Sequence, residues 1–191
     1  MHRHASVGTA LCLTVALATG AAIFAAPVQV RDAPRSTCDL LAPEEIAAVQ
    51  QAAVREQKSH EEQQGGLRFR QCLFETSQFE RSVSLTVIAP AANGDDRSAV
   101  RQYWNKSFHA PPRRTMQPPE NARPVRKKDP PRPVAGTGEE AFWTGNPRAG
   151  ALYVLSDGVV VRISIGGVSD EEERLQRSRR LAEAALRRLR G

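Results

Sequence analysis

Alternating hydrophobic and polar residues mark two strands in the first half of the chain. Residues 82–89 alternate most regularly, with Val83, Leu85 and Val87 separated by serine and threonine. Residues 67–76 alternate in a similar way, and only the connection 77–81 lies between the two segments. Alternation with a period of two is typical of half-buried antiparallel strands, and a connection this short is typical of a hairpin. We therefore predict an antiparallel pair of strands here.

A second hairpin is predicted around Asp157-Gly158, which stands between two hydrophobic runs. This dipeptide favours a two-residue type I′ turn, because that turn needs a positive φ at both positions. The turn sets the register of the two strands, and one face of the hairpin is then assigned to the hydrophobic core. From the turn outward, the paired residues of this core face are Ser156 with Val159, Val154 with Val161, and Leu152 with Ile163.

The opposite face of the same hairpin pairs Leu155 with Val160 and Tyr153 with Arg162. The second pair brings the Arg162 guanidinium against the Tyr153 ring, a favourable contact between a cation and an aromatic face. The segment EEAFWT at 139–144 is predicted to form the strand that precedes this hairpin.

Residues 43–53 show the spacing of an amphipathic helix. Pro43 suits the first helical turn, where its missing N–H is not needed, and Glu44 and Glu45 face the positive end of the helix dipole. The helix is predicted to end in the charged run before the glycine pair at 65–66. Its expected apolar stripe consists of Ile46, Val49 and Ala53.

Two further helices are predicted. Asparagine and aspartate at 93–96 supply helix-start chemistry for the second, and Ser169 with Glu172 has the spacing of a capping box at the start of the third. The second helix is expected to turn a stripe toward the core rather than toward a ligand; the stripe consists of Val100, Tyr103, Trp104 and Phe108. The buried side of the third consists of Leu175, Ala182, Ala185, Leu186 and Leu189.

These elements predict an α+β fold in the order α-β-β-α-β-β-β-α, with an antiparallel sheet of about five strands and helices packed on it. We expect a signal peptide at 1–25, a flexible lead-in at 26–37 and a single domain at 38–190. The signal consists of a short basic start and an alanine-rich apolar run that ends in small residues. It indicates export to the periplasm or beyond, with an uncleaved membrane anchor as the alternative, since the run is long enough to span a bilayer.

The chain beyond the signal contains two cysteines, Cys38 and Cys72. Disulfides form in the oxidising compartment that export implies, and no C-x-x-C redox motif is present. We therefore predict a structural disulfide between them. Closing a loop of this size contributes about 3–4 kcal/mol in the chain-entropy model.

A basic, proline-rich segment at 110–135 is the compositional outlier of a chain whose net charge is +6. Its prolines exclude helix and central strand, and loops this long are usually functional or disordered. The plain interpretation is a solvated, disordered insertion, and the functional hypothesis is that the segment binds an anionic partner. The predicted binding residues are Arg113, Arg114, Arg123, Arg126, Lys127, Lys128 and Arg132.

The expected partner is an unidentified envelope protein or an anionic surface, with membrane contact that is peripheral at most. Nucleic acid is not expected, because the compartment is wrong and the segment has no aromatic residues for stacking on bases. We expect no cofactor and no metal site, since only His60 and His109 remain beyond the signal and neither stands in a ligand pattern.

No sequence motif of a common catalytic site occurs. We therefore expect a non-catalytic binding or assembly protein of the cell envelope, with an envelope hydrolase as the alternative. A deep pocket that contains His109 or a strongly perturbed carboxylate would favour the hydrolase. A flat sheet face beside the proline-rich segment would favour binding.

The order of these motifs resembles a family of small bacterial exported proteins, domain of unknown function 3558. The resemblance covers residues 38–189 without the proline-rich segment, and it rests on the helix start CDLLAPEEI, the strand start CLF, the segment GTGEEAF, a hairpin and a C-terminal helix. It implies an exported α+β domain and supplies no catalytic residues. The lipobox usual in that family is missing, because Leu11 precedes Cys12.

Overall fold

The computed structural model describes residues 36–91, 97–110, 129–146, 149–167 and 170–191. The chain divides into two units, Met1–Val30 and Arg31–Gly191, and all described residues belong to the second. Its first half contains the 3₁₀ turn η1 (Thr37–Leu40), α1 (Pro43–Gln50), β1 (Val54–Gln64), β2 (Leu67–Thr76), η2 (Phe79–Arg81) and β3 (Val83–Pro90). Its second half contains α2 (Ser98–Trp104), the π-helical turn η3 (Asn105–His109), β4 (Arg132–Pro133), β5 (Glu140–Asn146), β6 (Ala149–Ser156), β7 (Val159–Ile165) and α3 (Glu171–Leu189).

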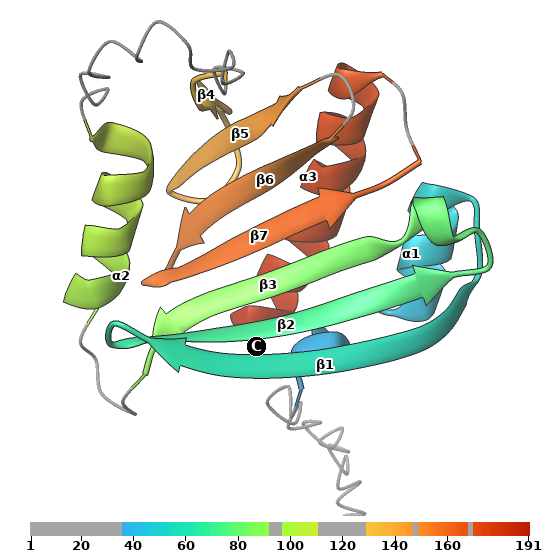
Figure 1. The fold of residues 1–191 in the computed structure, drawn as a ribbon, viewed down its shortest axis with the longest axis horizontal. Coiled ribbons are helices and arrows are strands. Elements are labelled where there is room, and N and C mark those ends of the chain that lie inside the picture. Colours follow the sequence, from blue (N-terminus) through green and yellow to red (C-terminus); the bar gives the residue numbers. More distant parts are fainter. Residues whose placement is uncertain (1–35, 92–96, 111–128, 147–148, 168–169) are drawn as a thin grey trace, which may run out of the picture. The chain divides into compact units, whose positions relative to one another are not determined.

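The described strands form one antiparallel sheet in the order β1-β2-β3-β7-β6-β5-β4 (Figure 1). The predicted α+β class is confirmed, but the sheet has seven strands rather than about five. The two strands that the hydrophobic pattern did not indicate are β1 and β4, and both lie at edges of the sheet. Edge strands bury little surface, so they need no alternation of hydrophobic and polar residues.

The largest correction concerns the charged run Val54–Gln64, which forms strand β1, whereas the sequence predicted that the first helix ends within it. Helix α1 ends at Gln50, because Gln51 adopts a left-handed conformation with φ 55°. Ala53, predicted in the apolar stripe of this helix, lies outside it and is exposed. The pair Gly65-Gly66, with φ values of 59° and 77°, turns the chain into β2.

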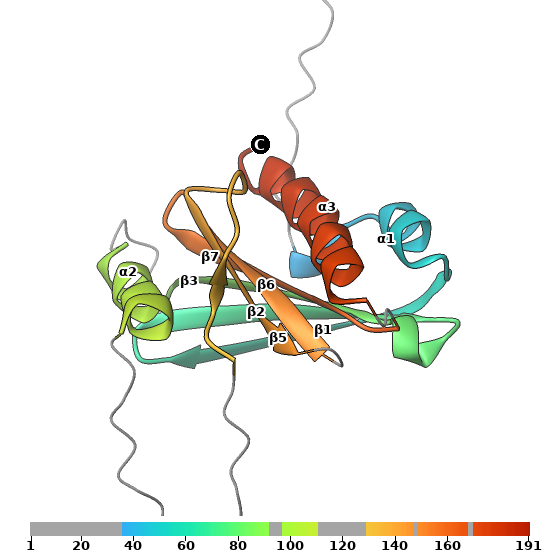
Figure 2. The ribbon, with the colours of Figure 1, turned by 90° about the horizontal axis from the view of Figure 1, so that it is seen from above.

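One face of the sheet packs against α1, α3 and η1, and α1 and α3 lie on the same side of it (Figure 2). The predicted register of the β6–β7 hairpin is confirmed. So is its core face, because Leu152, Val154, Val161 and Ile163 are all fully buried there. Leu175, Ala182, Ala185 and Leu186 of α3 are buried against them, and Leu189 is partly buried, as predicted.

The second face of the sheet has a smaller core, which the sequence did not separate from the first. Helix α2 covers one end of this face with Val100 and Trp104, both fully buried, and the predicted core-facing stripe is thereby confirmed. Tyr103 and Phe108 complete the stripe and are partly buried against the same cluster. No described helix covers the other end of this face (Figure 1).

The disulfide between Cys38 and Cys72 is present, with an S–S distance of 2.06 Å and a Cα–Cα distance of 5.2 Å. It joins η1 to β2, whose Cys72 is fully buried in the larger core. The disulfide thus ties the first turn of the domain to β2, the strand next to the edge strand β1. The pairing predicted from the two cysteines is confirmed.

Helix α3 begins one residue later than the capping box predicted. Asp170 is its N-cap, and the Asp170 Oδ1 accepts a hydrogen bond of 2.7 Å from the Glu173 backbone N–H. Ser169 lies outside the described residues, as do Asn93, Asp95, Asp96 and the predicted signal peptide. Among the described helices, none is long and apolar enough to cross a membrane.

Candidate functional site

Of the seven predicted anion-binding residues, the structure describes one. Arg113, Arg114, Arg123, Arg126, Lys127 and Lys128 lie outside the described residues. Arg132 begins strand β4, and its side chain is half-exposed. Its guanidinium lies 3.5 Å from a carboxylate oxygen of Glu172 and 3.8 Å from one of Glu171, at the start of α3. Arg132 is therefore engaged within the domain, while the other six residues remain a prediction.

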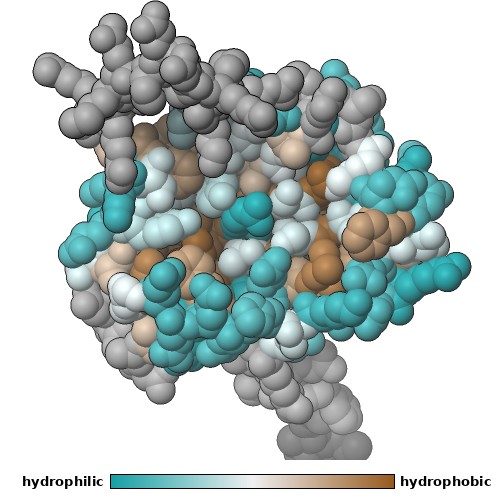
Figure 3. Space-filling model, in the orientation of Figure 1, coloured by the Kyte–Doolittle hydropathy of each residue, from teal (hydrophilic) through white to brown (hydrophobic). Residues whose placement is uncertain are grey.

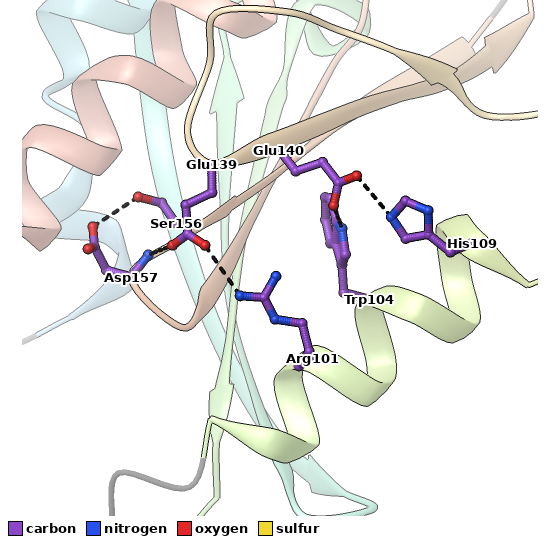
Figure 4. A network of polar contacts seen from close by, with 7 residues as sticks. All are labelled: Arg101, Trp104, His109, Glu139, Glu140, Ser156 and Asp157. Carbon is purple, nitrogen blue, oxygen red and sulfur yellow. Dashed lines mark hydrogen bonds and ion pairs between the residues drawn. The ribbon is translucent and has the colours of Figure 1, made fainter.

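The described residues before the proline-rich segment are held by Glu140 at the start of β5 (Figure 4). The His109 Nε2 lies 2.9 Å from one Glu140 oxygen, and the Trp104 indole N–H donates to the other. The His109 ring also stands edge-on to Phe142, with centroids 5.6 Å apart. Burial by itself raises the pKa of Glu140, but the hydrogen bonds from Trp104 and His109 and the charges of His109 and Arg101 outweigh it and lower the pKa.

Glu139, the neighbouring acid, fastens the tip of the β6–β7 hairpin to helix α2. One of its oxygens accepts a hydrogen bond of 2.6 Å from the Asp157 backbone N–H, and the other lies 3.4 Å from the Arg101 guanidinium. The Ser156 hydroxyl donates to the Asp157 carboxylate at 2.9 Å (Figure 4). Asp157 has a positive φ of 53°, as the predicted turn requires. These contacts hold a turn in place.

Ser156 and His109 do not form a nucleophile and base pair, because each is bound to a different acid. In Figure 4, Ser156 and Asp157 lie on one side of Arg101 and His109 lies on the other, so the serine has no histidine base beside it. The pKa of Glu140 is lowered, which does not favour a role as a proton donor at neutral pH. Within the described part of the chain, no three histidine, cysteine or acidic side chains gather as metal ligands do.

We call the end of the second sheet face that no described helix covers the open face. A row of mostly polar residues crosses it from strand to strand. Cross-strand pairing aligns one residue from each of six strands across the sheet. Figure 3 views the molecule from this side and shows weakly polar and hydrophobic residues next to one another in its middle. From β1 to β5, the aligned residues are His60, Gln71, Thr86, Arg162, Tyr153 and Phe142. Phe142 is buried against Trp104 and Phe108, so the polar row ends at Tyr153.

Arg162 is the central residue of this row. Its Nε donates to the Tyr153 hydroxyl at 3.0 Å, and its guanidinium carbon lies 5.6 Å from the centroid of the Tyr153 ring. The predicted contact between these two side chains is confirmed. Sequence reasoning used Arg162 only for packing, because Gln71 and Thr86 reach it through strands more than seventy residues away in the chain. No local signal in the sequence brings them together.

Comparisons with known proteins add little to this picture. No family model matches the chain and no curated protein matches it, so the resemblance to domain of unknown function 3558 is not confirmed. Among solved structures, the extracellular domain of PknH from Mycobacterium tuberculosis matches with a TM-score of 0.43 and 12% sequence identity. The match covers 80% of this chain and 95% of that domain. Similarity at this level does not define a family or a function.

Proposed function

We propose that this protein is an exported, non-catalytic domain that attaches to an anionic partner in the cell envelope. Three features support export and binding: the N-terminal sequence pattern of a signal peptide, the disulfide between Cys38 and Cys72, and the open sheet face. The expected location is the periplasm or the outside of the cell. The partner is an anionic envelope surface or an acidic envelope protein, and any membrane contact is peripheral.

The observation that carries the proposal is how the described ends of the basic segment are held. On one side, His109 pairs with Glu140 of β5. On the other side, β4 pairs with β5, and the Val134 backbone N–H donates to the Ala141 carbonyl at 2.9 Å. Both ends are thus attached to one strand of a disulfide-bonded domain. If the charges in the segment between these ends bind a surface, the whole domain is therefore attached to that surface.

The charge of this segment determines the class of partner. Between residues 110 and 135, seven lysine and arginine residues stand against Glu120 and Asp129. Each basic residue near an anionic lipid surface contributes about 1 kcal/mol, so several together give reversible attachment. Because the interaction is between exposed charges, it weakens with salt as the screening length falls to about 3 Å at 1 M.

The test is co-sedimentation of the purified protein with vesicles across a salt series. We expect binding to vesicles that contain phosphatidylglycerol, loss of that binding at high salt, and none to neutral phosphatidylcholine vesicles. Changing Arg123, Arg126, Lys127 and Lys128 to glutamine should remove most of the binding.

A matched control changes the same number of exposed arginines elsewhere, in β1, in α3 and at the C-cap of α3: Arg55, Arg180, Arg187 and Arg190, each to glutamine. This control lowers the net charge by the same amount and should keep most of the binding. Equal loss in both variants would show that net charge alone drives attachment. Binding that the first variant keeps in full, or that salt does not weaken, would exclude the basic segment as the attachment site.

A further inference from the structure

The open face contains a cation whose charge the described part of the chain does not balance. Arg162 is half-buried on β7, and its flanking residues in the row, Thr86 and Tyr153, are uncharged. The next residues outward, Gln71 and Phe142, are uncharged too. No described carboxylate lies within ion-pair distance of the guanidinium. Arginine in such a position is a recognition group for an anion, because its planar fork matches two oxygens at once.

The donors of Arg162 are divided between the protein and the open face. Its Nε is bound to the Tyr153 hydroxyl at 3.0 Å, and this bond holds the guanidinium over the Tyr153 ring. The terminal nitrogens of Arg162 make no hydrogen bond to any other described residue. They are the two donors that a bidentate contact with a carboxylate uses.

Helix α2 adds a second hydroxyl at the border of the open face. Tyr103 packs edge-on to Phe69, with centroids 6.1 Å apart, and it interacts electrostatically with Tyr153 and Arg162. Burial first and then the neighbouring Tyr153 raise the pKa of Tyr103, against a smaller lowering from Ser107 and Arg162. The Tyr103 hydroxyl has one hydrogen-bond partner in η3, the Ser107 side chain, and keeps capacity for a further hydrogen bond.

Hydroxyl and amide groups continue away from Arg162 along the strands. The pair Ser84 and Ser164 lies in the next row of the same face, opposite each other across β3 and β7. The Gln71 amide donates to the Ser84 hydroxyl at 3.0 Å, and the Ser164 hydroxyl donates to the Gly150 carbonyl at 2.8 Å. The same row ends on β1 at Lys58, which is paired with Glu56 and Glu75. A surface with one cation that no described carboxylate pairs with, beside aromatic rings and hydroxyls, suits a ligand that has one negative charge and many hydroxyls.

We propose that the open face binds the carboxylate of an acidic saccharide, with Arg162 as the anchoring residue. The carboxylate takes the two terminal nitrogens of Arg162. The Tyr103 hydroxyl and the polar groups of Gln71 contact the sugar hydroxyls beside it. A single guanidinium matches the single charge of a uronate, whereas a doubly charged phosphate is better matched by a cluster of cations. This site is distinct from the basic segment and goes beyond the attachment proposed above.

The test is a calorimetric titration of the purified protein with trigalacturonic acid, galactotriose and inorganic phosphate at moderate salt. We expect binding of the acidic trisaccharide and at least a tenfold weaker affinity for the neutral one and for phosphate. Arg162→Gln should lower the affinity for trigalacturonic acid at least tenfold. Arg162→Lys should restore only part of it, because the charge returns without the fork.

Two further variants complete the experiment. Tyr103→Phe keeps the ring against Phe69 and removes the hydroxyl with its hydrogen bond to Ser107. It should weaken binding several-fold and lower the melting temperature only by the small amount that one hydrogen bond contributes. Arg180→Gln, on the exposed side of α3, removes the same charge as Arg162→Gln and should leave the affinity unchanged. The melting temperature of each variant shows that it is folded.

Three results would overturn the proposal: no detectable binding of trigalacturonic acid at millimolar concentration, equal affinity for the neutral trisaccharide or for phosphate, or unchanged affinity in Arg162→Gln. The variant of Arg123, Arg126, Lys127 and Lys128 separates this site from the basic segment. It should lose vesicle binding and keep saccharide binding. If it loses the saccharide while Arg162→Gln keeps it, the segment and not the open face is the saccharide site.

Discussion

Reduction of the Cys38–Cys72 disulfide should destabilise the domain by an amount that the fold allows us to estimate. The bond closes a loop over a sequence separation of 34 residues, which includes α1, β1 and the first part of β2. Opening it returns conformational freedom to the unfolded chain and costs about 3–4 kcal/mol in the chain-entropy model. For a domain of this size, that corresponds to a fall in melting temperature of roughly 6–15 °C.

The contacts around the bond indicate which element is destabilised first when the bond is reduced. Leu40 and Leu41, which follow Cys38 and Asp39, are 1% exposed each, and Cys72 is fully buried. Their burial holds η1 on β2 while the bond is intact. Without the cross-link, η1 is held by these apolar contacts, by its own short turn and by Arg188 of α3, whose guanidinium donates to the Leu40 carbonyl at 3.2 Å. We therefore expect its backbone amides to exchange faster with solvent before the sheet opens.

The assay is thermal unfolding followed by circular dichroism, with and without a reductant, on the parent and on a variant with Cys38 and Cys72 both changed to alanine. Reducing the parent removes the cross-link but keeps both sulfur atoms, so it isolates the entropic contribution. The alanine variant should melt at a lower temperature than the oxidised parent and should not respond to reductant. If the fully reduced parent melts within about 2 °C of the oxidised one, the reasoning is wrong.

Two other predictions concern the core and the acid stability. Val161→Asp places an unpaired charge at a fully buried position and should lower the free energy of unfolding by several kcal/mol. Ser164→Asp, on the half-buried opposite face, should lower it less. Equal unfolding midpoints of the two variants in urea would contradict the core assignment. Because the pKa of Glu140 is lowered in the folded state, its carboxylate stabilises the domain above the ordinary value of 4.5, and this stabilisation is lost as the pH falls through the lowered value. Glu140→Gln should therefore flatten the decline of stability in acid, and a parallel decline in parent and variant would rule out this attribution.

The sequence by itself determined the elements that bury an alternating or helical stripe. Strands β2, β3, β6 and β7, helix α3 and the register of the last hairpin were predicted in this way and are present. The period of the apolar residues in each segment is a local property of the sequence, and it is matched by one secondary structure that places those residues on a single buried face. The disulfide was predictable for a different reason, because only Cys38 and Cys72 remain beyond the signal.

Only the tertiary structure decided the position of the edges. Strand β1 is polar along its length and is exposed from its second residue onward. It is a strand because β2 offers it a partner along ten paired positions, and no local preference of its own sequence indicates this. Strand β4 is likewise defined by its pairing with β5, in a segment whose prolines favour no regular structure by themselves.

The candidate site also depended on tertiary contacts between distant segments. The sequence indicated the contact between Tyr153 and Arg162, because the two residues face each other across a two-residue turn. It did not indicate that Gln71 and Thr86 extend the same row, or that Tyr103 of α2 borders it, because β7 joins β3 across a long stretch of chain. Binding surfaces on a sheet are assembled across strands, and the order of strands is decided by packing of the whole domain rather than by any one segment.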